Sequence, residues 1–174
     1  MGVLLREGTK MRVLVAILCS FGISVSASDL ETWGEIGVWE ILVDAAVGNG
    51  CLAQRIFEDG TLVQIGAEPA RNGGFFAAYN AEWSDIKDGA IGIVNIDFGD
   101  ARFAGDVVGK INQNLPGGYA FFDNPSFVTE FGERQSVMIS GETGRLIEID
   151  LTGSKRAIEA VLDCQKEQPE PVSN

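Results

Sequence analysis

The stretch LAQRIFEDGTLVQI, residues 52–65, shows the fold class of this chain most clearly. One run of mainly apolar residues extends from Leu52 to Phe57, and a second, from Thr61 to Ile65, follows Asp59 and Gly60. An Asp-Gly pair between two such runs is a strong signal for a β-hairpin. It predicts a type I′ turn, in which both central residues have positive φ. The stretch therefore predicts two antiparallel strands joined by a tight turn.

Similar runs, separated by glycine-rich turns, recur along the chain. In the last of them, Ile147, Ile149 and Leu151 alternate with Glu148 and Asp150, which predicts a strand with one buried and one wet face. Consecutive hairpins imply antiparallel pairing, so we predict a mainly β domain of about eight strands, an antiparallel sandwich or an open barrel. The other predicted strands are 38–43, 75–79, 91–98, 103–108 and 137–140.

Helix signals are fewer. Ser154 is predicted to cap a helix from Lys155 to Gln165, whose apolar stripe would pack on the sheet. A shorter helix is predicted at 125–131, and a helical turn at 80–87 with Trp83 and Ile86 inward. The predicted core residues are Trp39, Ile41, Ile56, Ile65, Ile93, Ile96, Phe98, Ile139, Ile147, Ile149, Ile158, Val161 and Leu162.

Residues 11–27, MRVLVAILCSFGISVSA, have the pattern of a secretory signal peptide: a basic residue, an apolar run and a small-residue cleavage site. We therefore expect residues 1–27 to be removed, with the true start at Met11, and no stable membrane anchor afterwards. Residues 28–165 are predicted to form one β-rich domain, and residues 166–174 a disordered tail without an apolar period. This places the mature chain in the periplasm or outside the cell.

Two cysteines, Cys51 and Cys164, remain after cleavage, and in an oxidising compartment they are expected to form a structural disulfide. The alternative is a redox pair, which would usually lie in a Cys-x-x-Cys motif. Because residues 1–27 carry three cations and one acid, their removal changes the formal charge from −12 to −14. An acidic chain is repelled by nucleic acid and by anionic lipid, so nucleic acid is not an expected partner.

The chain contains no histidine, which excludes Ser-His-Asp and Cys-His catalysis and histidine-bound zinc. We expect no metal site and no cofactor. Carboxylate pairs suited to glycoside hydrolysis are available at Asp85 and Asp88 and at Asp97 and Asp100, although aspartate is also a preferred turn residue.

Aromatic residues cluster in glycine-rich settings, and Phe76, Tyr119 and Phe122 are candidates for an exposed binding surface. The alternative is that both faces of the sheet are covered and these rings are core. We favour a non-enzymatic binding or interaction module with a protein or glycan partner. A carboxylate-dependent glycoside hydrolase and a structural envelope protein are the alternatives.

Three segments carry a resemblance to known proteins: Asn80-Ala81-Glu82-Trp83, the turn 97–100, and the ending 151–165. They resemble largely uncharacterised small exported β-rich proteins of alphaproteobacteria and, more distantly, the invasion-associated locus B family. That family carries additional cysteines that this chain lacks, so a link to host-cell invasion is not carried over. The resemblance implies an exported β-rich domain and no catalytic residue.

Overall fold

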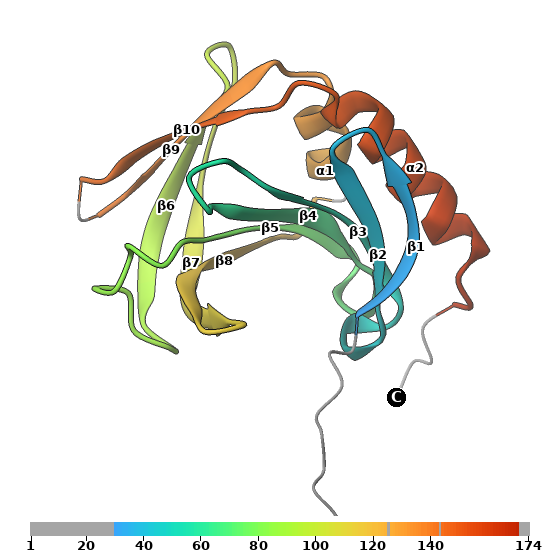
Figure 1. Cartoon of the computed structure of the whole chain (residues 1–174), viewed down its shortest axis with the longest axis horizontal. Helices are drawn as coiled ribbons and strands as arrows, with labels where there is room; N and C mark the ends of the chain where they lie inside the picture. The colour runs from blue at the N-terminus through green and yellow to red at the C-terminus, as the bar shows by residue number, and fades with distance from the viewer. Residues whose placement is uncertain (1–29, 125, 143, 171–174) are drawn as a thin grey trace, which may run out of the picture.

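The computed structural model describes residues 30–124, 126–142 and 144–170. These residues form a ten-stranded antiparallel sheet in the order β1-β2-β3-β4-β5-β8-β7-β6-β9-β10 (Figure 1). The sheet is not closed, so the mainly β prediction is confirmed in its open-barrel form. The strands are β1 (Leu30–Ile36), β2 (Trp39–Asp44), β3 (Gly50–Ile56), β4 (Leu62–Glu68), β5 (Gly73–Tyr79), β6 (Ile91–Asp97), β7 (Arg102–Asn112), β8 (Leu115–Phe122), β9 (Ser136–Gly141) and β10 (Leu146–Asp150).

The hairpin predicted at residues 52–65 is formed by β3 and β4, but the predicted turn type was wrong. Gly60 has a φ of +80°, whereas Asp59 is not among the residues with positive φ. The three-residue loop is closed by the bond from the Phe57 N–H to the Thr61 carbonyl, at 2.9 Å. The Asp59 carboxylate accepts hydrogen bonds from both the backbone N–H and the hydroxyl of Thr61. These bonds stabilise a turn in which Asp59 keeps a negative φ.

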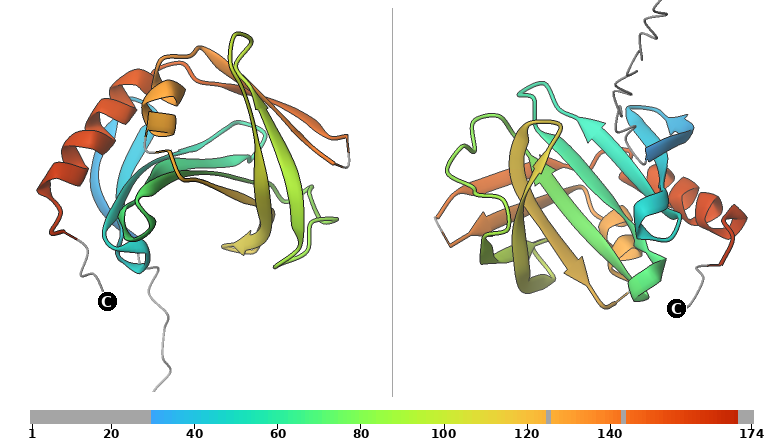
Figure 2. Two further views of the ribbon diagram at one scale, coloured as in Figure 1. Left: turned by 180° about the vertical axis from the view of Figure 1, so that it is seen from behind. Right: turned by 90° about the horizontal axis from the view of Figure 1, so that it is seen from below.

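Two pairings of the sheet join strands that are distant in sequence, β5 with β8 and β6 with β9. They turn a series of local hairpins into one strongly curved sheet, which arches through the molecule in Figures 1 and 2. The register places a row of small and apolar residues on one face across six neighbouring strands: Ile41, Ala53, Ile65, Phe76, Ala120 and Val107.

Both α-helices of the described residues cover this face, which we call the helix-bearing face. Helix α2 (Ser154–Glu167) packs on β2 and β3, and α1 (Ser126–Gly132) packs on α2, β4 and β5 (Figure 2). The predicted cap of α2 was wrong: Gly153, at a φ of +82°, occupies the N-cap position, and the Ser154 hydroxyl is buried without a hydrogen-bond partner. Short 3-10 helices at Ala45–Val47 and Pro69–Arg71 complete the fold.

Most of the predicted core is buried on the helix-bearing face. Phe98 and Ile147 are half-buried and pack against that core. Ile56, Ile93 and Leu162 were wrongly placed in the core, because they are 68%, 47% and 39% exposed. The first two lie on the opposite face of the sheet. The correctly predicted core residues are Trp39, Ile41, Ile65, Ile96, Ile139, Ile149, Ile158 and Val161.

The opposite face of β2 to β5 also buries apolar side chains, so most of this half of the sheet is covered on both faces. A second cluster there is flanked by the partly buried Leu30, Leu115 and Tyr119 from β1 and β8. Burial on both faces accounts for the near-continuous apolar runs of β4 and β5. The members of the cluster are Leu42, Leu52, Leu62, Phe75, Ala77 and Tyr79.

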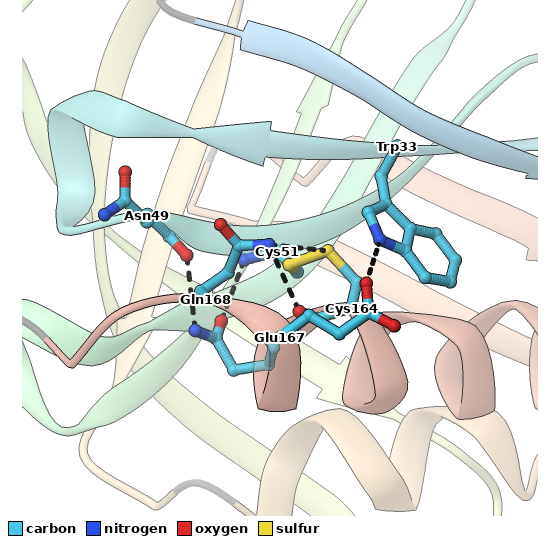
Figure 3. Close-up of a disulfide and its surroundings, with 7 residues drawn as sticks. Trp33, Asn49, Cys51, Cys164, Glu167 and Gln168 are labelled. Carbon is cyan, nitrogen blue, oxygen red and sulfur yellow. Dashed lines mark hydrogen bonds between the residues drawn. A yellow bond between two sulfur atoms is a disulfide. The ribbon is translucent and has the colours of Figure 1, made fainter.

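A disulfide joins Cys51 of β3 to Cys164 of α2, as the sequence predicted, with 6.1 Å between the Cα atoms (Figure 3). Both cysteines are fully buried. Beside the bridge, the Gln165 side chain accepts from the Cys51 N–H at 2.9 Å and donates to the Asn49 carbonyl at 3.2 Å. Trp33 of β1 donates to the Glu167 carboxylate at 2.9 Å. The disulfide and these hydrogen bonds thus attach α2, at the end of the domain, to β1 and β3 near its beginning.

The residues predicted to form the signal peptide lie outside the described part of the chain, as do residues 171–174 of the predicted tail. Helix α2 extends to Glu167, two residues beyond the predicted domain boundary. None of the helices in the described segments is long and apolar enough to cross a membrane.

Candidate binding pocket

A pocket of about 280 Å³ lies on the helix-bearing face, on the half of the sheet that the helices leave uncovered. Strands β5, β8, β7, β6, β9 and β10 form its floor and walls, and the loop of residues 80–90 closes one side. Its lining is mostly apolar, which suits an apolar group of a ligand. The larger apolar residues that line it are Phe76, Trp83, Ile86, Ile91, Ile93, Val94, Val107, Ile139 and Ile147.

Small residues occupy many of the strand positions that line the pocket. A Cβ added at Gly118 would lie 2.8 Å from the Val107 side chain, so this position tolerates nothing larger than glycine without movement. At Gly141 the situation differs, because no atom lies within 4 Å of an added Cβ. The small lining residues that lie in strands are Ala78, Gly92, Gly109, Gly118, Ala120 and Gly141.

The 80–90 loop is held against the strands by backbone hydrogen bonds. The Gly89 N–H donates to the Gly109 carbonyl at 2.8 Å, and the Gly109 N–H donates to the Ala90 carbonyl at 2.7 Å. The predicted helical turn at 80–87 is replaced by two successive turns, each closed by a bond between residues three apart. Trp83 points inward as predicted and is 9% exposed.

Charged side chains surround the mouth of the pocket. Arg145 binds Asp85 at 2.7 Å and lies 5.7 Å from the centre of the Trp83 ring. Lys87 and Glu142 also line the pocket. The hydrogen bond from Arg145 lowers the pKa of the Asp85 carboxyl, and a backbone hydrogen bond adds to this effect. A lowered pKa keeps Asp85 ionised, the opposite of what a general acid near neutral pH requires.

Three of the four carboxylates proposed from the sequence as catalytic pairs, Asp85, Asp97 and Asp100, bind cations or turn backbone. Asp97 accepts the Gly99 N–H at 2.7 Å and binds Arg102 at 2.8 Å. Asp100 forms an ion pair with Arg134. No group of three or more Cys, Asp or Glu side chains in the described residues is arranged to hold a metal ion.

The three candidate aromatic residues do not form one surface. Phe76 is 4% exposed, lines the pocket and packs 5.5 Å from the Phe131 ring. Phe122 lies on the same face, half-buried, with its ring stacked at 3.8 Å on that of Phe127. Tyr119 lies on the opposite face, where its hydroxyl donates to the Glu68 carboxylate. Of the three, Phe76 alone contributes to the pocket.

Sequence reasoning missed the pocket itself, although one signal for it was present. Glycines stand at positions of β6, β7, β8 and β9 that face the same side of the sheet, and Gly109 pairs directly with Gly118. Glycine weakens a strand interior, so its repeated use on one face marks a place where side chains are kept out. Recognising it required the register of β7 against β8 and of β6 against β9, which hairpin signals do not provide.

Comparisons with known proteins support the fold. No known family model matches the chain, and no curated protein matches it in sequence. Among solved structures, the crystal structure of invasion associated protein B from Bartonella henselae is similar, with a TM-score of 0.52 and 11% sequence identity. The match covers 79% of this chain and 99% of that chain. At this identity the likeness shows a shared fold and nothing about activity.

Proposed function

We propose that this protein is a non-enzymatic binding module of the periplasm or the cell exterior, and that its pocket takes up an apolar group of a protein or glycan ligand. The observation that carries the proposal is the mostly apolar pocket of about 280 Å³, which is lined by glycines from four strands on one face of the sheet. The buried disulfide supports export, because such bonds persist in oxidising compartments.

The chemistry at the mouth favours binding over acid catalysis. Of its two acids, Asp85 is held in an ion pair that lowers its pKa. A glycoside hydrolase needs one carboxylic acid with a raised pKa and a second carboxylate across the scissile bond. With no histidine in the chain, the commonest alternative proton donor is missing as well.

The pocket by itself supplies a modest affinity. Burying one side chain of the size of leucine or phenylalanine contributes about 1.5–3 kcal/mol. That corresponds to a dissociation constant in the millimolar range or weaker. A biological ligand therefore makes further contacts outside the pocket, and the pocket selects which apolar group is accepted.

An uncharged fluorescent naphthylamine, N-phenyl-1-naphthylamine, tests the proposal because its emission rises in apolar surroundings. We expect saturable binding to the native protein. Gly141→Leu, which extends a side chain into the open space of the pocket, should weaken it at least tenfold.

Gly34→Leu is the matched control. Gly34 lies in β1, outside the pocket, and no atom lies within 4 Å of a Cβ added there either. This variant should bind the dye as the native protein does. Absence of saturable binding, or equal binding by Gly141→Leu, would refute the proposal and favour a structural role in the envelope.

A further inference from the structure

The sheet ends at β10, and the backbone of this strand is open on one side. The Leu151 N–H donates to the Gln135 carbonyl at 2.8 Å, next to the β9–β10 register. In an antiparallel pair, residues alternate between bonding the partner and facing away from it. The backbone groups of Leu146, Glu148 and Asp150 therefore face the open edge, where no other described strand pairs with β10.

A groove of about 430 Å³ runs along this edge, between β10 and the turn that joins β3 to β4. Arg55 of β3 reaches across the opening: its guanidinium donates to the Asp150 carbonyl at 3.2 Å and lies 3.5 Å from the Asp150 carboxylate. This contact occupies one edge carbonyl at the end of β10. Of the remaining edge residues, Glu148 lines the groove, and Leu146 lies at the start of β10.

The edge groove and the apolar pocket are adjacent, because Ile147 lines both. Paired residues on neighbouring strands place their side chains on the same face. On a strand added at β10, the residue opposite Ile147 would therefore point to the helix-bearing face, toward the pocket. Its neighbours in sequence would point to the opposite face, beside the Glu148 and Asp150 side chains.

The charges around the edge indicate the kind of partner. Glu58 and Asp59 line the groove on the hairpin side, and Glu148 and Asp150 line it on the β10 side, against the single cation Arg55. The whole chain has a formal charge of −12. Such an edge attracts a basic segment and repels a second copy of this chain.

We propose that a basic, extended segment of a partner protein adds to β10 as a further strand and places one apolar side chain in the pocket. This inference rests on the proposed function, since it identifies the ligand of the same pocket. Main-chain hydrogen bonds to the edge supply affinity that the pocket alone lacks. Specificity comes from the pocket, which accepts a side chain that points to the helix-bearing face.

Synthetic heptapeptides test the inference. Each alternates lysine with apolar residues, and the central residue is alanine, leucine or phenylalanine. Binding is measured by calorimetry at two salt concentrations. We expect leucine or phenylalanine to bind at least fivefold more tightly than alanine. A version of the best peptide, N-methylated on the backbone positions that face β10, should bind at least tenfold more weakly at unchanged charge.

Two substitutions on the protein separate backbone pairing from charge. Glu148→Pro removes the edge N–H, and proline is tolerated on an edge strand where its nitrogen faces outward. Glu148→Gln removes only the charge. We expect at least a tenfold loss of peptide affinity for Glu148→Pro and about two- to threefold for Glu148→Gln. Naphthylamine binding should be unchanged in both variants, which also shows that both remain folded.

Each outcome decides between the two proposals. If the dye binds the pocket and the peptides bind equally with and without N-methylation, the strand-addition inference fails and the proposed function stands. If neither dye nor peptide binds, both fail. If Glu148→Pro abolishes a concentration-dependent dimer instead of peptide binding, a second copy occupies the edge and the inference is overturned.

Discussion

Replacing both bridged cysteines, Cys51→Ala with Cys164→Ala, should lower the stability of the domain by a large, calculable amount. The disulfide spans 113 residues of sequence. The loop-closure entropy of a loop of this length corresponds to about 4.8 kcal/mol at 25 °C. With an unfolding entropy of about 2.1 cal/mol/K per residue over roughly 140 residues, this loss lowers Tm by about 15 °C. The core on the helix-bearing face should nevertheless keep the variant folded.

Urea unfolding followed by tryptophan fluorescence measures this loss. The m-value should rise in the variant, because its unfolded chain is less constrained and exposes more surface. Trp33→Phe is the control: it removes the hydrogen bond from Trp33 to Glu167 beside the bridge and should cost only about 1 kcal/mol. A loss below about 2 kcal/mol for the double variant, or one no larger than that of the control, would refute the reasoning from loop closure.

Three further predictions concern the pocket and the two tyrosines, Tyr79 and Tyr119. Arg145 lowers the pKa of Asp85 below its ordinary value of 3.8, so this ion pair stabilises the fold above pH 3.8 and the contribution is lost as the pH falls through the lowered pKa. Arg145→Gln should raise the pKa of Asp85 in an NMR titration. Burial raises the pKa of Tyr79 to about 12 and also raises that of Tyr119, so absorbance should show no tyrosine ionising near pH 10 in the native protein. Gly109→Ala should displace the 80–90 loop and destabilise the domain by more than 1 kcal/mol, since its Cβ would lie 2.2 Å from a loop carbonyl.

Each of these has a control and a contradicting result. If the pKa of Asp85 in the native protein is 3.8 and Arg145→Gln does not change it, the ion pair between Asp85 and Arg145 does not form in solution. Tyrosine absorbance that rises at pH 10 without unfolding would contradict the burial of either ring; urea-unfolded protein should show that rise. Gly105→Ala is the control for Gly109→Ala, because its Cβ lies 3.8 Å from the Phe122 ring, an ordinary contact.

Local signals in the sequence predicted three of the hairpins and the C-terminal helix, because these elements depend on residues that are close together in the chain. Alternation along 146–151 and the turn at Asp59 and Gly60 are of this kind. The disulfide was predictable because only two cysteines remain after the expected cleavage, so each has one possible partner. The β1 and β8 strands were missed. LETWGEI in β1 lacks a clean alternation and is mostly exposed, and LPGGYAFF in β8 contains one proline and two glycines, which are depleted in strands. Ile56 and Ile93 were placed in the core because an apolar residue in a strand does not by itself show which face of the sheet is covered.

The pocket could not be predicted because it depends on pairings that are not local. The curvature that brings the β9–β10 hairpin over β5 and β8 follows from the β5–β8 and β6–β9 ladders. The long-range contact of Arg145 with Asp85, 60 residues apart in sequence, then completes the mouth. No turn motif or periodicity encodes these distances.

Methyl NMR with the uncharged naphthylamine tests the central claim, an accessible apolar pocket on the helix-bearing face, most directly. Protein labelled at isoleucine, leucine and valine methyl groups is titrated, and shifts are mapped residue by residue. We predict saturating shifts at pocket methyl groups and none in the second cluster, at Leu42, Leu52 and Leu62. Shifts centred on that cluster, or none that saturate, would contradict the account. The methyl groups expected to respond are those of Val94, Val107, Ile139 and Ile147.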